Sequence, residues 1–293
     1  MKSPLLSILF CTVAGWAIAT AQVKTPIVIP FTKTGQGHIL VKAHVNGVEG
    51  TFIFDTGAGL NLLTKKFADK VASLQKTDGF FVGHRATGEA IETDIWIIKD
   101  LQLGNFQAAN QKTAVLDMEF PIDGLISLMP FKHGALTIDY AQSHLIVESP
   151  AALQTMAVAS YSLPLQVVDD RDISLEIATY VQLNNKVTAQ ISLDCGAGWN
   201  VFRFSARYMK QLGIDTTQTT NVYARSPFDT TKGNHYYSTT LQELRTTTPG
   251  AGVKNIKTTF IDGLIWEGIT SINWLGDRIT IDIPRKRLLL PRK

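Results

Sequence analysis

The 293-residue sequence has few of the features that mark a disulfide-stabilised or membrane-anchored protein. It contains two cysteines, Cys11 and Cys195, and the first lies in an apolar N-terminal segment that we expect to be removed. One remaining cysteine cannot form an intramolecular disulfide, so the hydrophobic core must hold the fold together. No second long apolar run follows, so we expect no membrane anchor after that removal.

The sequence also lacks the common signatures of metal, nucleotide and serine-hydrolase sites. It has no His-Glu-x-x-His or Cys-x-x-Cys pair, no P-loop and no Gly-x-Ser-x-Gly turn, which leaves no motif for a metal or a nucleotide. The net charge of +3 is too small to indicate a nucleic-acid partner. We therefore expect no metal, no cofactor and no nucleic acid. The 45% hydrophobic composition is typical of a packed globular protein of about two domains.

The N-terminal segment has the pattern of a cleavable signal peptide. Lys2 supplies a positive charge, Leu5 to Ile18 is almost purely apolar, and Ala19-Thr20-Ala21 offers a small-x-small cleavage site. Residues 1–21 are therefore predicted to be a signal peptide. The mature chain then begins at Gln22, and we expect it to be secreted or periplasmic.

The remaining sequence repeats itself. An apolar strand pattern runs into Asp-x-Gly-Ala-Gly twice, at Asp55 and again at Asp194. A second motif, Asp-Gly-Leu-Ile, occurs at Asp123 and recurs at Asp262, with the same offset as the first. Two motifs that hold one offset indicate a tandem duplication. The closing strands ALTIDYAQSHLIVE and RITIDIPRKRLLL have a slightly larger offset, which predicts a four-residue insertion around residues 267–277.

The duplication predicts two lobes, residues 22–150 and 161–293, with residues 151–160 as a weakly patterned linker. Both lobes are mostly β with one short helix each, for which Thr64 and Ser205 are the candidate caps. The segment GFFVGHRATGEAIETDIWII predicts a hairpin whose tip lies between Gly83 and Gly88. Residues 221–240 are expected to form the corresponding hairpin of the second lobe.

One Asp at the end of a strand in each copy suggests a specific chemistry. Either Asp alone would be read as a turn residue, but the matched spacing favours a facing pair. Two facing carboxyls share one proton, so the pair can both accept a proton from water and donate one to a peptide carbonyl. We interpret Asp123 and Asp262 as structural turn residues.

The motifs Asp55-Thr56-Gly57-Ala58, Asp123-Gly124-Leu125-Ile126 and Leu136-Thr137-Ile138-Asp139 resemble one lobe of a retropepsin-like aspartic protease. The first lobe is most similar to secreted bacterial aspartyl proteases. The resemblance implies a two-lobed, acid-protease-like β-barrel fold that binds a peptide or protein substrate. It also implies roles for the following residues: Asp55 and Asp194 as the catalytic pair, Thr56, Gly57, Ala58, Cys195, Gly196 and Ala197 as their support, and Phe81, Gly83 and His84 in a flap.

Two departures from the family pattern lead to expectations of their own. Cys195 stands where the first lobe has Thr56, and a thiol is a weak donor, so we expect a lopsided hydrogen-bonded clasp between the two loops. Ala58 and Ala197 stand where pepsin-like enzymes usually carry a hydroxyl, which should raise the carboxyl pKa values and move the pH optimum towards neutral.

Two functions remain open at this point. The first is an exported aspartic endopeptidase that works as a monomer, since the duplication supplies both carboxyls within one chain. The alternative is a non-catalytic peptide-binding pseudoprotease with a degenerate second lobe.

Overall fold

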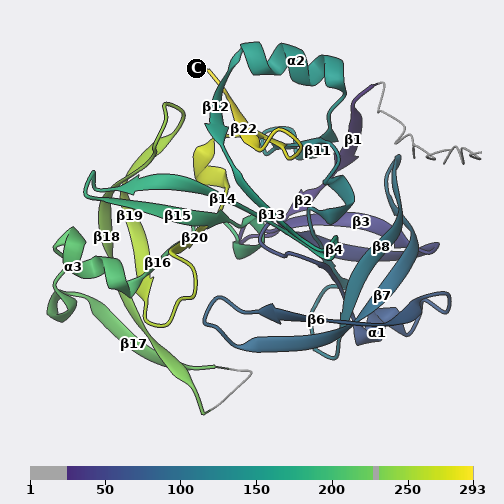
Figure 1. The fold of residues 1–293 in the computed structure, drawn as a ribbon, viewed down its shortest axis with the longest axis horizontal. Helices are drawn as coiled ribbons and strands as arrows, with labels where there is room; N and C mark the ends of the chain where they lie inside the picture. Colours follow the sequence, from purple (N-terminus) through teal and green to yellow (C-terminus); the bar gives the residue numbers. More distant parts are fainter. Residues whose placement is uncertain (1–24, 227–230, 293) are drawn as a thin grey trace, which may run out of the picture.

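The structure of the chain is a computed structural model that describes residues 25–226 and 231–292. The predicted signal peptide, residues 1–21, lies outside the described residues. Strands dominate the fold, as the sequence predicted, and they form three sheets. Figure 1 shows two barrel-like sheets side by side, with the strands of a shared sheet and a helix above them.

The sheet of the first lobe has eight strands in the order β2-β3-β4-β9-β5-β8-β7-β6, and an additional β3–β7 pairing curls it towards a barrel. The strands are β2 (Thr32–Lys33), β3 (Ile39–Val45), β4 (Val48–Phe54), β5 (Asn61–Thr64), β6 (Gln75–His84), β7 (Ala90–Leu103), β8 (Phe106–Leu116) and β9 (Gly124–Ile126). Every second residue of β3 is buried, as expected for a strand with one face on the core. The short helix α1 (Lys65–Ala68) follows β5, and the Thr64 side chain caps it by accepting the Phe67 N–H, as predicted.

The sheet of the second lobe repeats this arrangement in the order β13-β14-β15-β20-β16-β19-β18-β17, with an additional β14–β18 pairing. Its strands are β13 (Gln166–Asp170), β14 (Ser174–Leu183), β15 (Val187–Leu193), β16 (Phe202–Ser205), β17 (Thr220–Arg225), β18 (Gly233–Thr246), β19 (Gly252–Ile261) and β20 (Gly268–Thr270). Ser205 is not the predicted cap of an α-helix. It precedes a 3₁₀ turn without a capping bond from its side chain, and α3 (Met209–Leu212) begins only after that turn.

A third, six-stranded sheet joins the two halves in the order β1-β11-β10-β21-β22-β12. Its strands are β1 (Ile27–Pro30), β10 (Ala135–Asp139), β11 (His144–Val147), β12 (Ser160–Pro164), β21 (Arg278–Asp282) and β22 (Arg287–Pro291). At its centre β10 of one half lies antiparallel to β21 of the other, with Thr137 opposite Thr280 and their hydroxyls 2.7 Å apart. One continuous hydrophobic core fills both lobes and the base formed by this sheet.

The segment predicted as a weakly patterned linker contains a helix, α2 (Pro150–Val158). Ser149 caps it by accepting the Ala152 N–H, and proline occupies its first position, where no backbone donor is needed. Leu153 packs α2 against Ala135 and Leu289 of the shared sheet. The fold therefore has a third helix beyond the one expected in each lobe. No helix of the described residues is long and apolar enough to span a membrane.

The second Asp-Gly-Leu-Ile motif is not the structural counterpart of the first. In the first lobe, Gly124–Ile126 forms β9, which runs parallel to β4. In the second lobe the strand in that place, parallel to β15, is β20 (Gly268–Thr270). The segment Asp262–Ile265 instead lies in the loop before β20.

Hydrogen bonds identify Glu267 as the residue that corresponds to Asp123. Asp123 Oδ2 accepts the Thr51 N–H at 2.8 Å, and Glu267 Oε2 accepts the Gln190 N–H at 2.7 Å. Thr51 and Gln190 hold the same position in β4 and β15, because each comes four positions before the Asp that follows its strand. The interpretation of Asp262 as a repeat of Asp123 is therefore wrong. The two motifs have the same sequence, but their backbones pair with different strands.

The additional residues of the second lobe also lie elsewhere than predicted. β5 pairs Thr64 with Leu116, and β16 pairs Ser205 with Ile261 in the same way. The chain between the paired residues is longer in the second lobe than in the first. The insertion therefore falls between Ser205 and Ile261, in the part of the lobe that contains the β17–β18 hairpin, rather than at residues 267–277.

Candidate active site

Asp55 and Asp194 occupy the same position in the two lobes, directly after a central strand. The Asp55 N–H donates to Ile126 O at 2.9 Å, and the Asp194 N–H donates to Thr270 O at 2.8 Å. Each Asp is therefore fixed at the point where a neighbouring parallel strand, β9 or β20, also ends. These bonds place both side chains at the junction between the lobes.

The two glycines that follow the aspartates set how closely the lobes approach. A Cβ atom on Gly57 would lie 2.5 Å from Asp194 Cγ, and one on Gly196 would lie 2.2 Å from Asp55 Cγ. Both distances are far below van der Waals contact, so only glycine fits at these positions. The backbone of each loop thus lies directly against the carboxyl of the other lobe.

Backbone donors hold one oxygen of each carboxyl. Asp55 Oδ1 accepts the N–H groups of Gly57 and Ala58 at 2.8 and 3.2 Å. Asp194 Oδ1 accepts the Ala197 N–H at 2.8 Å. The side chains of the two alanines add no hydroxyl to these contacts. The second oxygen of each carboxyl receives no backbone donor of this kind from the described residues and is available for a shared proton or a reacting group.

Beneath the carboxyls, Thr56 and Cys195 form a reciprocal clasp. Thr56 Oγ1 donates to Leu193 O at 2.7 Å and accepts the Cys195 N–H at 3.0 Å. Cys195 Sγ donates to Phe54 O at 3.2 Å and accepts the Thr56 N–H at 3.3 Å. The expected lopsidedness is therefore limited to the longer contacts of sulfur, because both sides make the same two bonds.

The thiol of Cys195 belongs to this clasp and is not a nucleophile. Its side chain is buried, and burial together with the charge of Asp55 raises its pKa far above the ordinary value. A thiolate is the reactive form of cysteine, so this residue is inert at neutral pH.

The pKa of Asp194 is raised well above its usual range. The first cause is burial, followed by the negative charge of Asp55 and a hydrogen bond with the Asp55 carboxyl. The Ala197 N–H and Arg203 act in the opposite direction but do not outweigh these effects. These causes differ from the missing hydroxyls at Ala58 and Ala197 on which the sequence expectation rested, because burial between the lobes comes first. A carboxyl in this state keeps a proton that it can donate.

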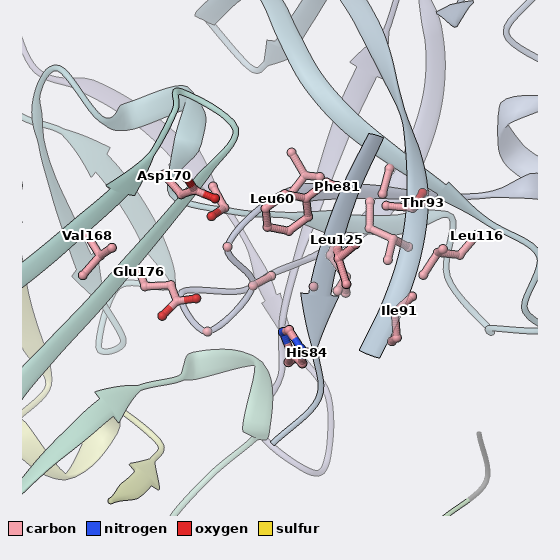
Figure 2. A pocket seen from close by; sticks show the side chains of 18 of the residues that line it. Leu60, Phe81, His84, Ile91, Thr93, Leu116, Leu125, Val168, Asp170 and Glu176 are labelled. Carbon is pink, nitrogen blue, oxygen red and sulfur yellow. The ribbon is translucent and has the colours of Figure 1, made fainter. Parts of the chain in front are cut away.

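The hairpin predicted as a flap is formed by β6 and β7, with the turn between them at residues 85–89. Phe81, Gly83 and His84 of β6 line a cavity of about 610 Å³, which Gly57 and Ala58 also line. We call this space the cleft. Figure 2 shows Phe81 with Leu60 and Leu125 on one side of the cleft, and His84 near its lower end. The flap strand therefore covers space next to the aspartates.

The opposite wall of the cleft comes from residues that sequence reasoning missed. Asp170 and Glu176 project from β13 and β14 towards the flap in Figure 2, and Ile265 and Trp266 line the cleft from the loop before β20. No motif marks these positions, because they lie in ordinary alternating strands and in a loop whose Asp-Gly-Leu-Ile sequence predicts a repeat of the first lobe. The duplication could have indicated such residues, since a cleft between two lobes must have one wall from each lobe.

The tip of the flap is docked on the second lobe. The Ile265 N–H donates to Ala86 O at 3.0 Å, and Ala86 packs, as Trp266 does, on a buried cluster that includes Leu264. The buried Glu89 carboxylate is hydrogen-bonded to Ser226 of the β17–β18 hairpin, which lowers its pKa. The loop that carries the misleading second motif thus holds the flap across the cleft.

Within residues 25–226 and 231–292, no three His, Cys, Asp or Glu side chains are grouped so that they could hold a metal ion.

Comparison with known proteins agrees with this geometry. Residues 41–129 match the model of a family described as aspartyl protease. A search of curated proteins found no match. Among solved structures, the chain is similar to an aspartic proteinase from Irpex lacteus, with a TM-score of 0.55 and 12% identity over 92% of this chain and 98% of that one. Family and fold together support a protease function. Part of the first lobe thus matches the aspartyl protease family, and the chain as a whole has the fold of the aspartic proteinases.

Proposed function

We propose that the chain is an exported aspartic endopeptidase in which Asp55 and Asp194 activate a water molecule. The observation that carries the proposal is the hydrogen bond between the Asp55 and Asp194 carboxyls across the lobe junction, each carboxyl being held by backbone N–H groups. Carboxyls that are hydrogen-bonded to each other share one proton. Such a pair is the machinery for adding water to a peptide carbonyl without a metal or a covalent intermediate.

The raised pKa of Asp194 suggests how the roles divide at the start of the reaction. Asp194 holds the shared proton and donates it to the peptide carbonyl oxygen. The Asp55 carboxylate accepts a proton from the water as the water attacks the carbonyl carbon. The resulting tetrahedral intermediate collapses when Asp55 passes its proton to the leaving nitrogen and the C–N bond breaks. A hydroxyl of the intermediate then returns a proton to Asp194, which restores the starting pair.

The alternative is a peptide-binding protein that has lost its chemistry through a degenerate second lobe. Three features favour the enzyme over this alternative. The second lobe has its aspartate, a backbone donor to that aspartate, and a thiol that makes the same two bonds as Thr56.

Hydrolysis of internally quenched peptides by the wild type and by Asp55→Asn and Asp194→Asn variants tests the proposal. We expect either substitution to lower kcat by about 10²–10⁴-fold, because each removes one member of the acid–base pair. Asp69→Asn is a matched control, since Asp69 is exposed and its ion pair with Lys65 lies at the surface. Wild-type rates in both dyad variants would exclude the mechanism. Binding without hydrolysis by the wild type would favour the alternative.

Export is part of the proposal and is supported by the sequence of residues 1–21. N-terminal sequencing of protein recovered from the medium or periplasm of an expressing cell should begin at Gln22. An intact Met1 in the exported fraction would contradict it. We further propose that the enzyme acts as a monomer, since both aspartates come from one chain.

A further inference from the structure

A smaller pocket of about 260 Å³ opens from the cleft on the side of the second lobe. Val168, Glu176, Ile265 and Trp266 line both spaces, so the two are continuous. We call it the Glu176 pocket. Pockets that enclose a whole small ligand are typically about 300–1,000 Å³, so this pocket has the size for one side chain of a longer molecule.

The Glu176 pocket is charged on one side only. Glu176 and Glu267 are its ionisable lining residues, and no lysine, arginine or histidine of the described chain lines it. Glu267 is already engaged, because its Oε2 accepts the Gln190 N–H and its carboxylate is hydrogen-bonded to Tyr208. The Glu176 carboxylate, in contrast, has no hydrogen bond or ion pair with any residue in 25–226 or 231–292.

The arginine that lines the cleft does not neutralise Glu176. Arg171 lines the cleft, but its Nε and Nη2 donate to the two oxygens of Asp170 at 2.9 and 3.2 Å. Glu176 is exposed as a whole residue. Partial burial of its carboxyl nevertheless raises its pKa, and the charge of Asp170 raises it further, so its surroundings are short of positive charge. Figure 2 shows the Glu176 carboxylate directed towards the middle of the cleft.

The rest of the pocket suits a long side chain with a charged end. Val168, Ile265 and Trp266 provide apolar surface next to the carboxylate. Lysine and arginine bury their aliphatic stems along such surface while the charged group reaches a partner. A guanidinium can also stack on an indole ring while it binds a carboxylate through two hydrogen bonds.

We propose that Glu176 determines specificity by binding an arginine or lysine side chain of the peptide substrate in the Glu176 pocket. This inference rests on the proposed function, because it concerns the peptide that lies in the same cleft. Ser192, which also lines the pocket, lies near the end of β15, just before Asp194. The basic residue therefore binds close to the scissile bond, only a short way from it along an extended peptide.

Pairs of quenched peptides that differ only by arginine or citrulline at one position test the proposal, with that position moved through the sequence around the cleavage site. Citrulline has the shape of arginine without its charge. At one position we expect kcat/KM to be roughly tenfold higher for arginine, as for a hydrogen bond between charged groups. Glu176→Gln should bring the ratio close to one, and Glu176→Lys should invert it.

Glu49→Gln is a charge-matched control, since Glu49 is exposed on β4 and its pairs with Lys42 and His44 lie at the surface. It should keep the wild-type ratio. Equal rates for arginine and citrulline at every position, or a ratio that survives in Glu176→Gln, would overturn the proposal.

Binding of the same peptides to Asp55→Asn protein, measured by fluorescence anisotropy, separates this inference from the proposed function. If the wild type cleaves no peptide but the protein binds arginine peptides more tightly than citrulline peptides, the proposed protease activity is wrong and the proposed pocket specificity stands. If peptides are cleaved or bound with no preference for arginine over citrulline, only the proposed specificity of the Glu176 pocket is wrong.

Discussion

At the scale of single residues, the site depends on contacts made across the lobe junction. Thr56 and Cys195 each bond to the strand that precedes the other, so a Thr in one copy and a Cys in the other still form a two-fold clasp. Sulfur makes longer and weaker bonds than oxygen, but it leaves no buried donor or acceptor of this clasp unpaired. The difference between the copies thus affects bond strength and leaves the geometry intact.

The raised pKa of Asp194 predicts how stability depends on pH. Between the pKa of an unfolded Asp and the raised value, the folded state holds a proton that the unfolded state has lost. This favours folding at low pH, and the benefit is lost as pH rises through the raised pKa. We expect Asp194→Asn to unfold at a higher temperature than the wild type near pH 7, by a few degrees, and the difference to shrink towards pH 3.

Thermal unfolding followed by intrinsic fluorescence from pH 3 to 8 measures this, with Asp69→Asn as the exposed control. A difference that grows on acidification would contradict the assignment. The same pKa predicts that hydrolysis declines as pH rises through it, since the pair then loses its shared proton.

The residues of the site were predictable where repetition marked them. Asp55 and Asp194 could be found because the same motif recurs at a fixed offset. Glu176 could not, because a strand residue shows its role only when the opposite wall of the cleft is known. Its lack of a partner among the described residues is a property of the folded chain.

At the scale of elements, the docking of the flap tip should control its motion. The bond from the Ile265 N–H to Ala86 O ties the turn at residues 85–89 to the second lobe. Ile265→Pro removes this donor, and Ile265→Ala shortens the side chain but keeps the N–H. We expect amide hydrogen exchange in residues 85–91 to be at least several-fold faster in the proline variant than in the alanine variant.

Hydrogen exchange followed by mass spectrometry compares the two variants on the same peptides, with β14 as an internal reference. Equal exchange in both would mean that the bond does not hold the flap, and a change that spreads to β14 would indicate general destabilisation instead.

The hairpin itself was predictable from its alternation and its glycines, but its partner was not. The letters Asp-Gly-Leu-Ile at residue 262 matched the first lobe better than Glu-Gly-Ile-Thr at residue 267 does, yet the latter forms β20. The pairing of β15 with β20 places the Glu267 side chain next to the Gln190 N–H. Its carboxylate accepts that hydrogen bond as the aspartate does in the first lobe. The segment with the matching sequence is therefore not the segment with the equivalent structural position.

At the scale of the whole molecule, the shared sheet joins the lobes through buried charge as well as through strands. Arg278 of β21 binds Asp139 at 2.9 Å and lies 3.7 Å from Glu148, both on the first half. The two acidic side chains are 6% and 2% exposed. Arg278→Met should leave them without this cation and cost about 2 kcal/mol, below the usual value for a buried pair because Arg278 is 43% exposed.

Denaturant unfolding measures this loss, with Lys42→Met as a control because its pair with Glu49 is exposed. The control should change stability by less than about 0.5 kcal/mol. We expect one transition in all variants, since the central sheet contains strands of both halves. Two separated transitions, of which only one moves, would show that the lobes unfold independently.

The duplication predicted two similar lobes, but not what joins them. The shared sheet pairs β10 with β21, which lie in different halves of the chain, and no local pattern shows such a pairing. The helix α2 was missed because its face is small and weakly apolar, although Ser149 and Pro150 form a recognisable start.

The close approach of Gly57 and Gly196 to the opposite carboxyls also bears on the history of the chain. The two copies have diverged to cysteine at the clasp, to glutamate at the base of β20 and to a longer outer hairpin. At these two glycines neither copy can change alone, because a single methyl group in one half would displace the aspartate of the other. The two halves can therefore differ at many positions, but each of these glycines is constrained by the aspartate of the other half.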